Sequence, residues 1–312
     1  SIFAVTRLEM ISMAAIPPAL TARRLEVTVI GAGVIGLTCA HALEQAGYRV
    51  AVVADDRPKV SDVAGGLWLP YAAGHSERVM GWALETLSWL ETRGFRARDY
   101  LHLQAAEPWW LNALPGDRVR RARVAELPAG YDHGWVLQVP LVEMARHLHE
   151  LEPPRITRRT VTSLDEFPGL VVNCSGLGAR ELAADPTVIA ARGQVVHVAG
   201  LPGLRCVCDE DEMIYVLPRE DRTVVGGSYE PGNENEAVDP AQTESLLARA
   251  RALVPLLTDA KVLGAHVGLR PVRADGPRVE REGNVIHCYA HGGAGLTLSW
   301  GCARRVVELA AG

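Results

Sequence analysis

The chain has 312 residues, of which 48% are hydrophobic and 22% are charged. This composition can fill a large core in one or two domains, and it excludes a disordered or fibrous protein. The formal net charge of −5 argues against nucleic acid or an anionic membrane as a partner, because both require a basic surface.

Residues 1–25 are expected to form an N-terminal extension. Their apolar patch precedes Arg23 and Arg24, whereas a signal peptide carries its positive charge before the apolar part. The apolar stretch 27–43 approaches the length of a membrane span, but it contains three glycines, which favour a buried strand and helix. We therefore expect a cytoplasmic protein without a membrane segment.

A strand, a glycine-rich turn and a helix are predicted next. The run VTVI, residues 27–30, is β-branched throughout, as in strands that are buried on both faces. A helix is expected over 33–45 and a second strand over 48–54, with the turn GAGVIG between the strands. This order is the context that a dinucleotide-binding motif requires.

The rest of the chain alternates between helical and extended patterns. Residues 285–290 are expected to form a strand, which a glycine loop joins to a long C-terminal helix. Further helices are expected over 76–91, 140–151 and 241–257, a buried strand over 170–176, and antiparallel strands in QVVHVA (194–199), MIYVLP (213–218) and TVVGGS (223–228).

These elements predict an α/β fold with two domains. Strand–helix units at both ends of the chain indicate a Rossmann-like domain, and the strands between them indicate a second domain with a mainly antiparallel sheet. Both domains are expected to be discontinuous. The first takes residues 26–75, 155–190 and 265–312, and the second takes residues 76–154 and 191–264.

The glycines of GAGVIG have distinct expected roles. Gly31 permits the tight turn, Gly33 lets the backbone approach a pyrophosphate, and Gly36 lets the helix pack on the strand. The N-terminus of the helix favours an anion. Asp55, at the end of the second strand, can accept hydrogen bonds from a ribose. The motif predicts a dinucleotide but does not distinguish FAD from NAD.

Two further features have more than one interpretation. The second glycine loop, residues 291–297, either aims a helix at the ligand or only lets strands and helix pack. Arg270, in LRPVR, has the planar fork that suits a carboxylate, but the chain has 30 arginines and most are expected to be surface charges.

Eight segments in order resemble the D-amino acid oxidase family, whose members are FAD enzymes. They span residues 27–303 and are VTVIGAGVIGLTCAHAL, DVAGGLWLPY, VVNCSGLGA, ARGQVV, YVLP, VVGGSYEPGN, VGLRPVR and HGGAGLTLSWGCA. The resemblance implies that the first domain binds FAD non-covalently and that the second binds the substrate.

The resemblance also assigns residues to the site. It implies that Arg270 pairs with the substrate carboxylate, that Tyr215 donates a second hydrogen bond to it, and that the Gly293 carbonyl accepts from the substrate amine. The expected cofactor contacts are Gly31, Gly33, Val34, Ile35, Gly36, Asp55, Ser61, Gly66, Leu67, Trp68, Gly292, Gly293, Gly295, Leu296 and Thr297. The expected substrate pocket is Leu69, Tyr215, Leu217, Arg270 and Ala294.

This chain departs from the family pattern around the pocket. Its segment before YVLP is short and lacks an additional tyrosine, Ala294 stands where an aromatic residue is common, and Leu69 stands where a polar one can be. The pocket is therefore expected to be open and apolar. The acidic run 209–212 argues against acidic substrates, or is only a solvated turn.

The activity that the resemblance implies is oxidative deamination of neutral D-amino acids. Hydride transfer from Cα to flavin N5 and reoxidation by O2 would give a 2-oxo acid, ammonia and hydrogen peroxide. The alternatives are a glycine- or sarcosine-type amine oxidase, a D-aspartate or D-glutamate oxidase, a quinone-linked amine dehydrogenase and a non-catalytic flavoprotein. A homodimer is possible.

The cysteines and histidines carry no expected chemistry. The six cysteines lack metal-ligand spacing and are expected to be buried free thiols, with one disulfide between distant positions left open. The histidines are expected to be structural or exposed, and no metal is expected.

Overall fold

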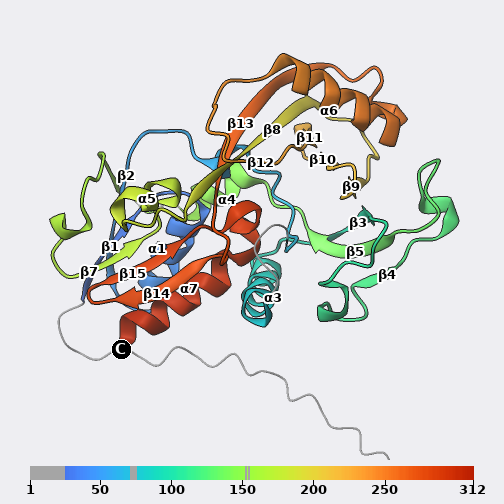
Figure 1. The fold of residues 1–312 in the computed structure, drawn as a ribbon. Coiled ribbons are helices and arrows are strands. Elements are labelled where there is room, and N and C mark those ends of the chain that lie inside the picture. Colours follow the sequence, from blue (N-terminus) through green and yellow to red (C-terminus); the bar gives the residue numbers. More distant parts are fainter. Residues whose placement is uncertain (1–24, 71–75, 152, 154) are drawn as a thin grey trace, which may run out of the picture.

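The computed structural model describes residues 25–70, 76–151, 153 and 155–312, which are arranged around two β-sheets (Figure 1). The N-terminal extension expected over residues 1–25 lies outside the described residues, apart from Leu25. The expected fold class is confirmed, because one sheet is mainly parallel and the other mainly antiparallel.

The first sheet has six strands in the order β14-β15-β7-β1-β2-β6. Strand β1 pairs in parallel with β2 and β7, β15 pairs in parallel with β7, and β14 is an antiparallel edge. Parallel strands bring their carboxyl ends to one edge, where ligands bind in open α/β sheets. The bounds are β1 Glu26–Ile30, β2 Arg49–Ala54, β6 Ile156–Arg158, β7 Leu170–Asn173, β14 Arg278–Glu282 and β15 Val285–Tyr289.

Helices α1 (Val34–Gln45) and α7 (Gly295–Ala311) pack on this sheet, and helix α3 (Glu77–Thr92) packs on α7. Trp89 of α3 stacks on Trp300 of α7 with ring centroids 4.5 Å apart. Gly301 permits close packing of these helices, because a Cβ there would lie 2.4 Å from the Trp82 Cα. Helix α3 thus reaches the first sheet through α7, and it also contacts the strand Trp135–Pro140 of the second sheet, in the range expected for the second domain.

The second sheet has nine strands in the order β12-β8-β11-β10-β9-β3-β5-β4, with β13 also paired to β8. The antiparallel pairing expected among β8, β10 and β11 is confirmed, and among the described strands of this sheet only β3 and β9 pair in parallel. The bounds are β3 Ala97–Leu103, β4 Val119–Arg121, β5 Trp135–Pro140, β8 Ile189–Ala199, β9 Cys206–Asp209, β10 Ile214–Pro218, β11 Arg222–Gly226, β12 Glu230–Pro231 and β13 Val262–Val272.

The domain boundary expected between residues 264 and 265 falls inside β13. This strand pairs with β8 from Val262 to Val272, with an irregularity between Val262 and Gly264. Two glycines and a proline interrupt the alternation of apolar and polar residues in β13, so its sequence lacks the two-residue pattern that would have predicted a strand. The division into domains remains a prediction.

Two helix predictions need correction at their ends. The helix expected from residue 140 begins at Met144, because Pro140 ends β5 and the Val142 N–H donates to the Gly66 carbonyl at 2.7 Å. The helix expected over 241–257 ends at Leu253, because Pro255 opens a separate turn.

Helix α6 (Pro240–Leu253) packs on β8. The remaining described helices are short: α2 Val60–Val63, α4 Met144–Leu151, α5 Ala179–Leu182, η1 Leu111–Ala113, η2 Val124–Glu126, η3 Leu164–Glu166, η4 Gly176–Gly178, η5 Pro255–Leu257 and η6 Gly292–Ala294. Among the described helices, none combines the length and apolar character that a membrane crossing requires.

His147 of α4 gives the fold a specific sensitivity to acid. Its ring packs against Trp89 and Phe95, and neither ring nitrogen has a hydrogen-bond partner among the described residues. Burial lowers the pKa of His147 to about 4. The unfolded chain therefore binds an extra proton below about pH 6.5, and stability is lost as the pH falls from about 6.5 to about 4.

We expect His147→Phe to weaken this pH dependence. The wild type should lose on the order of 3 kcal/mol more than the variant between pH 7 and pH 4. Urea unfolding at several pH values measures the difference, with His149→Gln in the same helix as the control. Parallel stability curves for wild type and His147→Phe would contradict this explanation.

Candidate active site

A cavity of about 1040 Å³ extends from the carboxyl edge of the first sheet to the second sheet. Its lining includes the ends of β1, β2 and β15 and the turn that follows β7, together with residues of β8, β9, β10 and β13. This volume slightly exceeds the usual range for small-molecule sites, about 300–1,000 Å³. The cavity can therefore hold a large ligand beside a small one.

The first glycine loop forms one end of the cavity. Gly31 has a φ of 107°, and a Cβ there would lie 2.4 Å from the Cys174 carbonyl oxygen. A Cβ on Gly36 would lie 2.0 Å from the Gly31 carbonyl oxygen, so only glycine fits at either position. Gly31, Gly33, Val34 and Ile35 line the cavity, and Gly36 supports them from behind.

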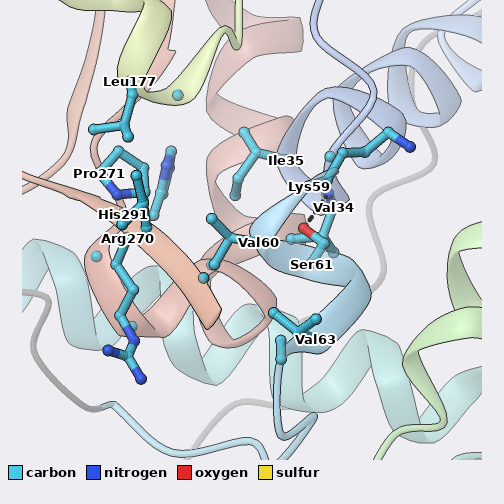
Figure 2. A pocket seen from close by; sticks show the side chains of 18 of the residues that line it. Val34, Ile35, Lys59, Val60, Ser61, Val63, Leu177, Arg270, Pro271 and His291 are labelled. Atoms are coloured by element: carbon cyan, nitrogen blue, oxygen red, sulfur yellow. Dashed lines mark hydrogen bonds between the residues drawn. The ribbon is translucent and has the colours of Figure 1, made fainter. Parts of the chain in front are cut away.

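Helix α1 begins at this loop with no acidic residue in its first turn, so its N-terminus favours an anionic ligand. The Val34 N–H donates to Ser61 Oγ at 3.0 Å, which joins the loop to α2 (Figure 2). Asp55 also lines the cavity, and its carboxylate accepts from the backbone N–H and the guanidinium of Arg57. Lys59 adds positive charge to this end, whereas the charge of Arg57 balances that of Asp55; neither basic residue had an expected role.

The second glycine loop leads into α7 and faces the same cavity. Gly292, Gly293, Gly295 and Leu296 line it. Ala294 is fully buried and is not among the lining residues. The N-terminus of α7 thus faces the ligand space, which favours the first of the two interpretations of this loop.

Two further expected cofactor contacts, besides Gly36, lie behind the cavity wall. Thr297 Oγ1 accepts from the Leu69 N–H at 3.1 Å and donates to the Leu69 carbonyl at 2.8 Å. Trp68 is fully buried, and its Nε1 donates to the Ala83 carbonyl at 3.0 Å. Neither lines the cavity, whereas Gly66, Leu67 and Leu69 do. Thr297 and Trp68 therefore position the segment 66–69 that lines the cavity.

Arg270 and Tyr215 lie at the end of the cavity nearest the second sheet, with Leu217 beside them. Arg270 Nη1 donates to the Ser228 carbonyl at 3.0 Å, and no carboxylate among the described residues pairs with the guanidinium. Burial raises the pKa of Tyr215, although the charge of Arg270 opposes this, so the phenol keeps its proton as a donor. The two side chains therefore present a cation and an O–H donor to the cavity.

Gly193 of β8 leaves the space that the Arg270 guanidinium occupies. A Cβ on Gly193 would lie 2.0 Å from Arg270 Nη1. The segment ARGQVV was part of the family resemblance, but a role for its glycine depends on the pairing of β8 with β13, which the sequence does not display.

We expect Gly193→Ala to displace the Arg270 guanidinium. The protein should stay folded, because the atoms that the new Cβ meets are at the end of the flexible Arg270 side chain and can move away. The Michaelis constant for a carboxylate substrate should rise about tenfold or more, which corresponds to about 1.4 kcal/mol. Steady-state kinetics and thermal unfolding measure both effects. Gly116→Ala is the control, because a Cβ on Gly116 meets no atom within 4 Å. An unchanged Michaelis constant in Gly193→Ala would contradict the expectation.

Arg219 also shapes the cavity, and sequence reasoning missed it. Its Nη1 donates to the Gly65 carbonyl at 2.7 Å, and its Nε donates to Glu143 Oε2 at 2.9 Å. The side chain is only 7% exposed. Its position directly after the segment YVLP could have suggested a place near the site, but with 30 arginines in the chain most were expected to be surface charges. The hydrogen bonds to the Ala64 and Gly65 carbonyls hold the loop 64–66 against the cavity, and the ion pair with Glu143 orients the guanidinium.

The acidic run 209–212 is more than a solvated turn. Asp209 is buried and accepts from the Tyr131 hydroxyl, and Asp211 accepts from the Ala105 N–H at 2.6 Å. Glu210 lines the cavity, and burial raises its pKa, as do the nearby charges of Asp211 and Asp209. A wall of this kind disfavours a second carboxylate on the ligand.

The cavity thus fits a dinucleotide cofactor together with a small carboxylate. The loop at Gly31 admits a close approach of the backbone, and two helix N-termini face the ligand space. The segments 66–69 and 292–296 come from distant parts of the chain and meet between the glycine loop and Arg270.

Comparisons with known proteins agree with this geometry. The family model described as "FAD dependent oxidoreductase" matches residues 26–309. A protein of Rubrobacter xylanophilus named D-amino-acid oxidase is 40% identical over 90% of this chain and 94% of its own length. One of Streptomyces coelicolor with the same name is 38% identical over 91% of this chain and 96% of its own length.

Among solved structures, the glycine oxidase of Geobacillus kaustophilus has a TM-score of 0.79 at 20% identity and covers 92% of this chain and 95% of its own. At this identity the likeness shows the fold alone. The family match spans both sheets and both glycine loops. The chain therefore belongs to the family of FAD-dependent oxidoreductases that includes the D-amino-acid oxidases.

Proposed function

We propose that this protein oxidatively deaminates neutral D-amino acids, consuming O2 and water and producing a 2-oxo acid, ammonia and hydrogen peroxide. The observation that carries the proposal is the half-buried Arg270 guanidinium, which faces the cavity and pairs with no carboxylate of the described chain. A cation in such a position is best satisfied by an anionic ligand. The names of the relatives support an amino acid as that ligand.

In the proposed complex, Arg270 binds the substrate carboxylate. One of its five N–H donors is already used by the Ser228 carbonyl, which fixes the plane of the guanidinium and leaves donors for a two-point contact. Tyr215 donates a further hydrogen bond to the same carboxylate. These contacts determine where the Cα of the substrate lies.

Gly293 completes the arrangement by accepting a hydrogen bond from the substrate amine through its carbonyl. FAD held by the two glycine loops would supply the acceptor for the hydride of the substrate Cα. With the carboxylate and amine both held, one enantiomer directs its Cα–H toward the cofactor and its side chain toward Leu69 and Leu217. These apolar side chains and the wall at Glu210 suit a neutral side chain.

The cofactor contacts that we propose are the residues expected from the sequence, in two groups. Gly31, Gly33, Val34, Ile35, Asp55, Ser61, Gly66, Leu67, Gly292, Gly293, Gly295 and Leu296 contact FAD, whereas Gly36, Trp68 and Thr297 support the loops that do. Ala294 belongs to the supporting group as well. The proposed cellular site is the cytoplasm, supported by six free thiols, and the proposed assembly is a homodimer.

The activity is tested by measuring oxygen uptake and peroxide release with four substrates. We expect turnover with D-alanine, none with L-alanine, and much less with glycine or sarcosine. Turnover of sarcosine above that of D-alanine would favour the amine-oxidase alternative. Consumption of D-alanine without release of peroxide would favour the quinone-linked dehydrogenase. If the intact yellow holoenzyme turned over none of the four substrates, the proposal would be contradicted.

A further inference from the structure

Four cysteines that are far apart in the sequence meet in the core at the wall of the cavity. Cys39 lies on α1, Cys174 follows β7, Cys288 lies on β15 and Cys302 lies on α7, elements that adjoin one another in Figure 1. All four are buried and free. Their separation in the chain explains why no metal-ligand spacing is visible in the sequence.

Three of these thiols form a compact triangle. The sulfur atoms of Cys39, Cys174 and Cys288 all lie within 4.8 Å of one another, and Cys39 Sγ is 3.9 Å from Cys288 Sγ. The centre of a triangle with such edges is about 2.3–2.8 Å from each sulfur. A bond between a zinc-like ion and a thiolate is about 2.3 Å long, so little rearrangement brings three sulfurs onto one ion.

The surroundings can complete a coordination shell. Cys288 hydrogen-bonds to Cys302, and its Sγ lies 3.9 Å from His291 Nε2. The thiols of Cys39 and Cys174 hydrogen-bond within the triangle. A thiolate or an imidazole is thus within reach as a fourth ligand, and no carboxylate belongs to the group.

We propose that Cys39, Cys174 and Cys288 bind one soft, thiophilic metal ion, of the class of Cu(I), Zn(II) and Cd(II). Soft thiolate ligands select such ions, and the ligands bind in deprotonated form. Each thiol that joins the ion releases its proton to solvent, and no oxidation is involved. The site is separate from the proposed oxidase activity and does not depend on it.

The position of this site links it to the glycine loop. The Cys174 carbonyl is the atom that a Cβ on Gly31 would meet, and Cys174 and Cys288 line the cavity. An ion at the triangle would join α1, β7 and β15, so it should raise the thermal unfolding temperature by mass action.

A second group of possible ligands, His102, Cys208 and Glu210, is a weaker candidate. It offers one sulfur, and both nitrogens of His102 already lie 3.1 Å from hydrogen-bond partners on Tyr100 and Gln104. The two groups are therefore distinguishable by the number of sulfur atoms around a bound ion.

The test is a titration of the FAD holoenzyme, with its cysteine thiols kept reduced, with Cd(II). The thiolate-to-cadmium charge-transfer absorption and the metal content after dialysis report the binding. We expect one tightly bound ion per chain, three or four sulfurs around it by X-ray absorption spectroscopy, and a higher unfolding temperature. Cu(I), which binds thiolates more tightly, should displace the cadmium, and Cd(II) should in turn displace Zn(II).

Cys39→Ser should abolish this binding, whereas Cys206→Ser, the same change at a buried cysteine on β9 in the other sheet, should preserve it. The visible flavin spectrum reports whether each variant is folded. If Cys39→Ser does not fold, the sulfur count around cadmium in the wild type still decides. No retained ion, one sulfur only, or binding that survives Cys39→Ser would overturn the proposal.

Discussion

Arg270→Ala should reduce kcat/KM for a neutral D-amino acid by roughly 30-fold to several thousand-fold, which corresponds to about 2–5 kcal/mol. The variant removes a half-buried cation that no described carboxylate compensates, so the substrate carboxylate loses its main partner. KM should rise and kcat should fall, because the same contact both binds the carboxylate and positions the substrate Cα. Steady-state oxygen uptake over a range of substrate concentrations measures the effect.

The control for this variant is Arg305→Ala, which removes an exposed arginine of α7 that pairs with Glu308. Its kinetics should match the wild type, and the flavin spectrum of both variants should be that of the holoenzyme. A kcat/KM of Arg270→Ala within threefold of wild type would show that another group binds the carboxylate.

Gly31→Ala should yield a protein that binds little or no FAD. Its Cβ would lie 2.4 Å from the Cys174 carbonyl oxygen, and the φ of 107° is one that alanine rarely adopts. Because the obstacle is backbone, β1 and β7 must separate or the loop must change shape. We expect a loss of FAD affinity of at least 100-fold, measured by flavin content and equilibrium titration of the apoprotein.

Gly81→Ala is the matched control for Gly31→Ala. Gly81 lies on the exposed face of α3, and a Cβ there meets no atom within 4 Å. The substitution should leave FAD binding intact and stabilise the fold by about 0.5–1 kcal/mol, since alanine favours a helix interior. Full FAD content in Gly31→Ala would show that the loop is more adaptable than its close contacts indicate.

Local patterns explain which parts of the fold the sequence predicts. The strand at VTVI, the glycine loop and α1 follow from β-branched residues, glycine spacing and helix period within 20 residues of chain. The strands β10 and β11 are equally local, because they pair as near neighbours. These segments hold much of the dinucleotide end of the site.

Long-range pairing explains what the sequence did not predict. The space that Gly193 leaves for Arg270 exists only because β13 lies along β8, about 70 residues away in the chain. Arg219 has a role at the cavity because it donates hydrogen bonds to the carbonyls of residues 64 and 65, which lie more than 150 residues earlier in the chain. The cysteine triangle likewise depends on the packing of α1, β7 and β15. Periodicity carries no information on such contacts.

The central claim is that bound FAD oxidises a D-amino acid whose carboxylate Arg270 holds. Its most direct test is an anaerobic titration of the holoenzyme with D-alanine and L-alanine, recorded by the visible flavin absorption. We predict complete bleaching by D-alanine alone, recovery in air with one peroxide per flavin, and bleaching of Arg270→Ala that is at least 30-fold slower at the same substrate concentration. Bleaching by L-alanine, or a flavin that D-amino acids leave unchanged, would contradict the account.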